Sequence, residues 1–157
     1  MTNKEIKIAY QEFQSLDELE AKDKELAQAA VEATELAYAP YSKFNVGAAV
    51  LFEDGVIIKG SNQENAAYPS GLCAERVALF HAHHTFPKES VKAIAVIARG
   101  SDGNITPELT FPCAACIQVM VESEKRGNGP IAIIIGSATK VLMVDSVQNL
   151  LPFSFGK

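Results

Sequence analysis

Three cysteines and one glutamate give the clearest chemical signal in this sequence. Cys73 lies two residues before Glu75, and Cys113 and Cys116 form a separate C-x-x-C pair. Three thiolates are soft ligands, and three is the number that a catalytic zinc ion uses when its fourth position stays open for water. Glu75 is not needed as a ligand, so it is available to move protons. The residue types therefore predict an open zinc site with an acid–base group beside it.

Both cysteine stretches are expected where a helix begins. Cys113 and Cys116 are three residues apart, so at the start of a helix they are neighbours on one face and can bind one ion. A helix N-terminus carries positive potential and free N–H groups, which lower the pKa of a thiol and favour the thiolate. Arg76 follows Cys73 by three residues and can donate to a ligand sulfur, which offsets the negative charge of three thiolates. The alternative for Arg76 is an exposed surface position.

Other interpretations of these residues are less specific. A single C-x-x-C also occurs in redox dithiols and in structural zinc sites, but a structural site usually has four protein ligands. A fourth cysteine is absent from the sequence, and the histidines begin eight residues after Cys73, more than two helical turns away. Glu75 could also serve only to stabilise a helix N-terminus. The missing fourth ligand favours catalysis over His81, His83 or His84 closing the site.

The elements that must position these residues follow from the hydrophobic pattern. Small and apolar residues recur at three- and four-residue spacing over 23–37, and an Asp54-Gly55 step separates two β-rich runs. Further apolar runs alternate with two more helical patterns. The predicted order is helix 23–37, strands 46–52 and 56–58, helix 72–84, strand 91–98, helix 112–126, strand 131–135 and a short strand at 140–144.

This order predicts an α/β fold, a three-layer α/β/α sandwich around a mixed sheet of about five strands. In such sheets a ligand crevice forms beyond the strand ends, at the N-termini of helices, where both cysteine stretches are expected. Residues 23–157 are predicted to form a single catalytic domain. Residues 1–22 form an N-terminal arm, and the sequence leaves open whether this arm packs on the domain.

Composition and charge narrow the class of protein. A chain of 157 residues with 48% hydrophobic residues can bury one domain core. Three cysteines, two of them close together, argue against a disulfide framework and favour a reducing, cytoplasmic setting. The apolar runs are too short to span a bilayer, and the start shows no signal-peptide pattern. A net charge of −5 without a basic cluster argues against nucleic acid and favours a small-molecule substrate.

Several ordered motifs resemble one enzyme family. Cys73-Ala74-Glu75 together with Pro112-Cys113-x-x-Cys116 resembles the signature of the zinc-dependent nucleoside and nucleobase deaminases. Stretches 38–49, 60–68 and 150–156 resemble, more closely, the small homotetrameric cytidine deaminases. The resemblance runs from about residue 24 to the C-terminus. It implies the cytidine deaminase-like fold and the hydrolytic deamination of cytidine and deoxycytidine, with ammonia release, in pyrimidine salvage.

The resemblance also implies a role for individual residues. One Zn²⁺ per subunit would be bound by Cys73, Cys113 and Cys116, with Glu75 as the proton carrier. Asn62 and Glu64 would hydrogen-bond the ribose hydroxyls. Phe44 would pack against the nucleoside, and the backbone around Ala74 would contact the pyrimidine. Tyr68 and Phe155 would reach into the site of a neighbouring subunit.

Three departures from the family pattern accompany this resemblance. Ile117 stands where the family often has arginine, the N-terminal arm is longer, and the 99–110 loop between the cysteine stretches is generous. Alternatives also stay open: a deaminase of another amino-pyrimidine nucleoside, or a zinc or redox module without enzymatic activity. A nucleic-acid editor is disfavoured because it needs a basic channel.

Overall fold

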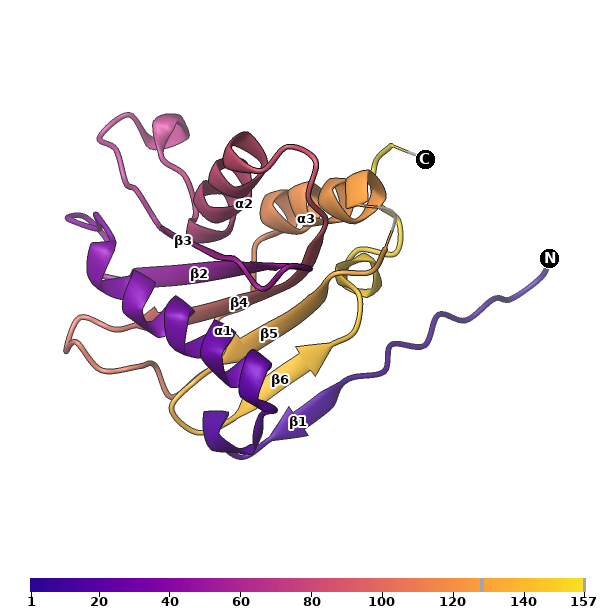
Figure 1. The fold of residues 1–157 in the computed structure, drawn as a ribbon, viewed down its shortest axis with the longest axis horizontal. Coiled ribbons are helices and arrows are strands. Elements are labelled where there is room, and N and C mark those ends of the chain that lie inside the picture. The colour runs from indigo at the N-terminus through magenta and orange to yellow at the C-terminus, as the bar shows by residue number, and fades with distance from the viewer. Residues whose placement is uncertain (128, 157) are drawn as a thin grey trace.

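The computed structural model describes residues 1–127 and 129–156, and within them the strands form one mixed sheet (Figure 1). The strand order is β1-β6-β5-β4-β2-β3, with β4 and β5 parallel and the other pairs antiparallel. The strands are β1 Gln11–Phe13, β2 Asn45–Phe52, β3 Ile57–Ser61, β4 Val91–Arg99, β5 Ala132–Gly136 and β6 Val141–Val144. The α-helices of the described residues are α1 Ala21–Ala33, α2 Ala74–Thr85 and α3 Ala114–Gly127.

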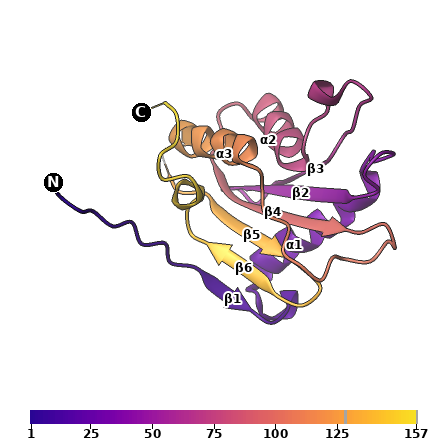
Figure 2. The ribbon, with the colours of Figure 1, turned by 180° about the vertical axis from the view of Figure 1, so that it is seen from behind.

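Helices cover both faces of the sheet, as the sequence predicted. Helix α1 lies on one face, and α2 and α3 lie together on the other (Figures 1 and 2). The central strand β4 supplies Ile94 and Val96 to the core under α2 and α3, and it supplies Ala95 and Ile97 to the core under α1. Side chains alternate along a strand, so a strand covered on both faces must be apolar almost throughout. The α/β/α sandwich is therefore confirmed.

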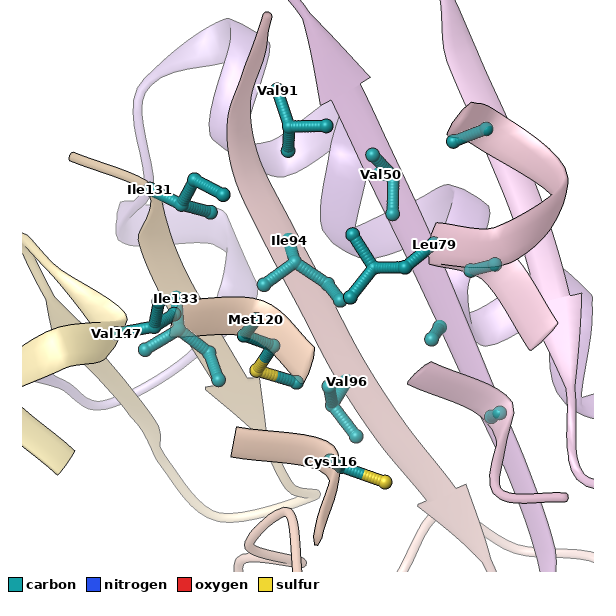
Figure 3. Packing of buried hydrophobic residues seen from close by; sticks show 14 of the residues in the cluster. Val50, Leu79, Val91, Ile94, Val96, Cys116, Met120, Ile131, Ile133 and Val147 are labelled. Carbon is teal, nitrogen blue, oxygen red and sulfur yellow. The ribbon is translucent and has the colours of Figure 1, made fainter. Parts of the chain in front are cut away.

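The core beneath α2 and α3 reaches directly to one of the predicted metal ligands. Leu79 of α2 and Met120 of α3 pack over Ile94 and Val96 of β4, and Cys116 lies at the end of this row of side chains (Figure 3). Cys116 and Met120 are both fully buried. Residues four apart on a helix share a face, so the packing of Met120 also fixes the orientation of Cys116.

Helix α2 approaches the sheet closely at Gly60. A Cβ atom at Gly60 would lie 2.3 Å from the backbone nitrogen of Ala78, a separation that real atoms do not reach. The absence of a side chain at this position lets α2 rest against β3. The position of the α2 N-terminus relative to the sheet depends on this contact.

The helices that carry the cysteines begin slightly later than the sequence predicted. Helix α2 starts at Ala74 rather than 72, because the backbones of Leu72 and Gln63 hydrogen-bond to each other in both directions at 2.9 Å and hold Leu72 extended. Cys73 is then the N-cap residue, with φ −70° and ψ 153°. Helix α3 starts at Ala114, two residues after the expected Pro112.

The N-terminal arm contributes a strand that the sequence pattern did not indicate. Gln11–Phe13 pairs antiparallel with β6, which makes the sheet of the described residues six strands wide where about five were expected. Leu19 is buried against the core under α1, which ties the end of the arm to the domain. Residues 1–10 are exposed along their whole length.

Candidate active site

The three cysteines come together at the N-termini of α2 and α3. Their sulfur atoms all lie within 4.8 Å of one another, and the Sγ atoms of Cys113 and Cys116 are 3.5 Å apart. Cys73 caps α2, and Cys113 directly precedes α3, where its carbonyl oxygen accepts from the amide of Ile117 at 3.0 Å. Two segments forty residues apart in the chain thus supply one cluster of sulfur donors.

The cluster has the dimensions of a zinc site. A tetrahedral ion with Zn–S bonds of about 2.3 Å holds its sulfur ligands about 3.8 Å apart. The Sγ atoms of Cys113 and Cys116, 3.5 Å apart, are near this value, and the three sulfurs all lie within 4.8 Å of one another. Soft thiolates are the ligands that select zinc over harder cations. The residues present therefore fit a zinc ion held by three protein ligands.

The electrostatics around Cys73 favour a thiolate. A hydrogen bond from the thiol of Cys116, and then the guanidinium of Arg76, lower the pKa of Cys73 to about 5. Arg76 Nη2 lies 3.7 Å from Cys73 Sγ, so the predicted contact between this arginine and a ligand sulfur is present. The hydrogen bond to Cys73, followed by burial, raises the pKa of Cys116. A divalent cation bound here would replace the proton that the sulfurs share.

Glu75 is buried beside the sulfur cluster. Its side chain is 4% exposed, and burial, followed by the negative charge of Cys73, raises the pKa of its carboxyl group. Cys73 has extended backbone outside the helix, so its side chain and that of Glu75 are not related by helical spacing. Glu75 is instead in the first turn of α2, one residue inside its start. A buried carboxylate with a raised pKa is suited to accept a proton and to return it.

A cavity of about 620 Å³ reaches the cluster at Cys73. This volume lies in the range of pockets that enclose small organic molecules. Its wall is formed by the loop after β3 and by the start of α2. The residues lining it include Tyr41, Ser42, Asn62, Glu64, Tyr68, Cys73 and Arg76.

Asn62 and Glu64 line this cavity, and both also hold the neighbouring loop. Asn62 Oδ1 accepts from the amide of Val46 at 2.8 Å, and its Nδ2 donates to the carbonyl oxygen of Phe44 at 2.9 Å. Glu64 Oε2 accepts from the amides of Tyr41 and Ser42, at 2.9 and 3.3 Å. Hydrogen bonds from Ser42, largest among the causes, lower the pKa of Glu64, so it stays ionised. One N–H of Asn62 and one oxygen of Glu64 remain for a ligand.

The other residues implied by the resemblance are more scattered. Ala74 is fully buried at the start of α2, where the first backbone N–H groups have no intrahelical acceptor. Phe44 is partly buried and held through its carbonyl oxygen by Asn62. Tyr68 is 93% exposed at the rim of the cavity, whereas Phe155 is 86% exposed and does not line it. A single chain therefore leaves two of the expected aromatic contacts open to solvent.

Two polar side chains of α3 hold the C-terminal segment and were not singled out from the sequence. Gln118 Nε2 donates to the carbonyl oxygen of Phe155 at 3.1 Å, and its Oε1 accepts from the amide of Phe155 at 2.9 Å. Glu124, 9% exposed, accepts from the amide of Ile131 at 2.8 Å and from the hydroxyl of Ser146 at 2.7 Å. Glutamine and glutamate on a polar helix face carry no signal of such partners, which lie far along the chain.

Comparison with known proteins places the chain in a family. Residues 20–127 match the "Cytidine and deoxycytidylate deaminase zinc-binding region". The chain belongs to this zinc-binding deaminase family. Zinc is accordingly the metal of the site formed by Cys73, Cys113 and Cys116.

Individual deaminases resemble the chain over most of its length. The cytidine deaminase of Halalkalibacterium halodurans is 41% identical over 83% of this chain and 91% of its own length. That of Sporosarcina psychrophila is 42% identical over 80% of this chain and 85% of its own length. The crystal structure of the Burkholderia pseudomallei cytidine deaminase matches with a TM-score of 0.69 and 40% identity, over 83% of this chain and 97% of that one.

Hydropathy adds one finding about the deaminase chain. None of the helices formed by residues 1–127 and 129–156 combines the length with the apolar character that crossing a bilayer requires.

Proposed function

We propose that this protein hydrolyses cytidine and deoxycytidine to uridine and deoxyuridine, with release of ammonia, in pyrimidine salvage. The observation that carries the proposal is the convergence of three zinc-binding sulfurs and a buried carboxylate, Glu75, beside a cavity of about 620 Å³. The similarity to proteins named cytidine deaminase supports the choice of substrate. Water supplies the oxygen that replaces the amino group of the ring, and the C–N bond breaks.

Zinc, when bound, supplies Lewis-acid activation of the attacking water. Glu75 would carry two protons in turn: its carboxylate takes the first from the attacking water and delivers it to the ring nitrogen, and it then takes the second from the newly added hydroxyl and delivers it to the departing amine. Burial raises the pKa of Glu75, which favours its holding a proton. Arg76 donates to Cys73 Sγ and so balances the charge of the thiolates. No net proton is consumed when ammonia leaves as NH₃.

Asn62 and Glu64 of the cavity wall hold the sugar, whereas Phe44 and Ala74, which do not line the cavity in a single chain, hold the base. The free oxygen of Glu64 accepts from a ribose hydroxyl, and the free N–H of Asn62 donates to one. Phe44 offers an aromatic face, and the backbone N–H groups at Ala74 meet the polar edge of the pyrimidine. Asn62 also fixes Phe44 through its carbonyl oxygen, which links the contacts to sugar and base.

A neighbouring subunit completes each site in this proposal. The protein assembles as a homotetramer, in which Tyr68 and Phe155 reach into sites of adjacent chains. Their exposure, 93% and 86%, supports this role, because aromatic side chains with so little cover are costly to leave in water. A cytoplasmic location follows from the need to keep the three ligand thiols reduced.

The direct test is to incubate the zinc-loaded protein with cytidine and to follow the loss of the ultraviolet band of cytidine together with the release of ammonia. Turnover of cytidine and deoxycytidine is expected. Zinc-loaded protein that leaves both nucleosides intact would rule the proposal out. The ratio of kcat/KM for cytidine to that for other amino-pyrimidine nucleosides separates a cytidine deaminase from a deaminase of a related compound.

A further inference from the structure

The N-terminal arm ends in an exposed extended segment with an alternating sequence. Ile6, Ile8 and Tyr10 are 54%, 46% and 59% exposed, and they alternate with Lys7 and Ala9. Figures 1 and 2 show this segment running outward from β1, away from the helices and the sheet. Alternate residues of a strand share a face, so these apolar side chains form one stripe. A stripe of this kind in water calls for a partner.

The segment continues a sheet edge that is open within the described residues. β1 stands at the end of the strand order and has β6 as its neighbour among the strands of residues 1–127 and 129–156. In the observed register Gln11 lies opposite Met143, so residues before Tyr10 run beyond Val144, where β6 ends. The outer edge of β1 and both edges of the preceding residues therefore offer unpaired backbone groups, which favour the addition of another strand.

We propose that residues 4–12 pair antiparallel with the same residues of a second copy of this chain, about a two-fold axis at Ile8. The two sheets then join through their β1 edges into one continuous sheet. An antiparallel pair related by a two-fold axis presents the same surface from both chains, as closed dimers require. In this register the cross-strand pairs are Ile8 with Ile8, Ile6 with Tyr10, Lys4 with Glu12, Glu5 with Gln11, and Lys7 with Ala9.

The sequence of the arm selects this register. With the axis at Ile8 the apolar residues oppose one another, and each Lys4 opposes a Glu12 of opposite charge. An axis at Lys7 sets two lysines directly opposite each other. An axis at Ala9 sets Ile6 against Glu12 and Glu5 against Phe13. Both alternatives place like charges together or charges against apolar groups, which destabilises a strand pair.

The alternation of side chains along the strand places the apolar stripe of the arm on the face opposite Phe13. Phe13 packs with the core under α1, so Glu12, Tyr10, Ile8 and Ile6 face the opposite side of the extended sheet. Glu12 is exposed there. The pairing therefore uses the arm without removing Phe13 from the core of its own chain.

The arm is remote from the zinc site, so its pairing can be tested separately from deamination. The cavity is lined from the loop after β3, at one edge of the sheet, and the arm continues β1 at the other edge. Variants in the arm should deaminate cytidine at the rate of the unaltered protein. Loss of activity and loss of association are thus separate outcomes.

The two-fold axis is tested by a disulfide. In Ile8→Cys the two introduced thiols face each other, and mild oxidation of the zinc-loaded protein should yield a disulfide-linked dimer on a non-reducing denaturing gel. The matched control is Thr2→Cys, which is also exposed but in this register lies about twelve residues of strand away from its counterpart, far beyond disulfide reach. Equal cross-linking of the two variants, or none in Ile8→Cys, would overturn the proposal.

The register is tested by exchanging charges. Lys4→Glu and Glu12→Lys each set like charges opposite each other twice in the dimer, and each should weaken association in sedimentation equilibrium about tenfold (an order of magnitude for two such pairs). The double variant Lys4→Glu/Glu12→Lys restores opposite charges and should recover the association of the unaltered chain. A double variant no better than either single one contradicts this register.

Discussion

The zinc site and the C-terminal segment of this chain are built in opposite ways. Cys116 and Glu75 are 0% and 4% exposed, and they are fixed by helices packed on the sheet. Phe155 is 86% exposed and is held through its backbone by Gln118, with its ring left free. The metal ligands and the carboxylate are thus complete within one chain, whereas in the proposed assembly the ring of Phe155 finds its contact in a second chain. The groups that carry out the chemistry need rigid positions, which packed helices provide. The enclosure of the substrate can instead be completed by a neighbouring chain.

The largest effect is expected in the zinc site, the first region of this comparison, when a metal ligand is removed. Cys113→Ala removes one of three sulfurs, and we expect zinc content to fall below about a tenth of the original, with loss of all measurable deamination. Elemental analysis of the purified variant measures this directly. Ala115→Ser, between Cys113 and Cys116, is the matched control and should keep its zinc. Full zinc occupancy in Cys113→Ala would contradict the ligand set.

Removing the proton carrier should leave the metal in place. Glu75→Gln preserves the size of the buried side chain but cannot take a proton, so we expect normal zinc content and a kcat lower by about 10² or more. Steady-state kinetics on cytidine, with zinc measured in the same sample, distinguish this from metal loss. Glu122→Gln, on an exposed position of α3, should behave as the unaltered enzyme. Unchanged kcat in Glu75→Gln would remove the carboxylate from the mechanism.

Gln118 provides a test of the second region, the C-terminal segment. Gln118→Leu removes both hydrogen bonds to the Phe155 backbone and should raise KM for cytidine about tenfold, with a smaller change in kcat. Phe155→Ala should have a similar effect, and the double variant should be no worse than either single one. The control is Phe153→Ala, at an equally exposed ring, with KM within about twofold. Additive effects of the two changes would show that Gln118 does not act through Phe155.

The smallest effect on catalysis is expected at Glu124, which connects α3, the helix of Cys116, to the chain after β6. Its carboxylate accepts from Ile131, Ser146 and Gln148, so Glu124→Gln sets an NH₂ group against one of these donors. We expect the free energy of unfolding to fall by about 1–3 kcal/mol, with kcat unchanged at low temperature. Chemical denaturation at fixed protein concentration measures the first quantity. A stability equal to that of the unaltered chain would show that this network is dispensable.

Elements set by local interactions could be predicted from the sequence, whereas those set by contacts between distant segments could not. The hairpin at Asp54-Gly55, the doubly buried strand β4 and the helices α1, α2 and α3 follow from local hydrophobic period and turn chemistry. Strand β1 did not, because three residues at an edge carry too short a pattern. The late start of α2 depended on pairing across the fold, that of Leu72 with Gln63.

The sequence by itself determined the donors: three thiols, a carboxylate and an arginine at spacings suited to a zinc ion, since residue type fixes the chemistry of a ligand. Only the tertiary structure decided that Cys73 lies outside its helix, that Glu75 is buried enough for its pKa to rise, and that Asn62 and Gln118 hold segments far along the chain. Burial and long-range hydrogen bonds depend on how the sheet brings distant segments together, and no local pattern records that arrangement.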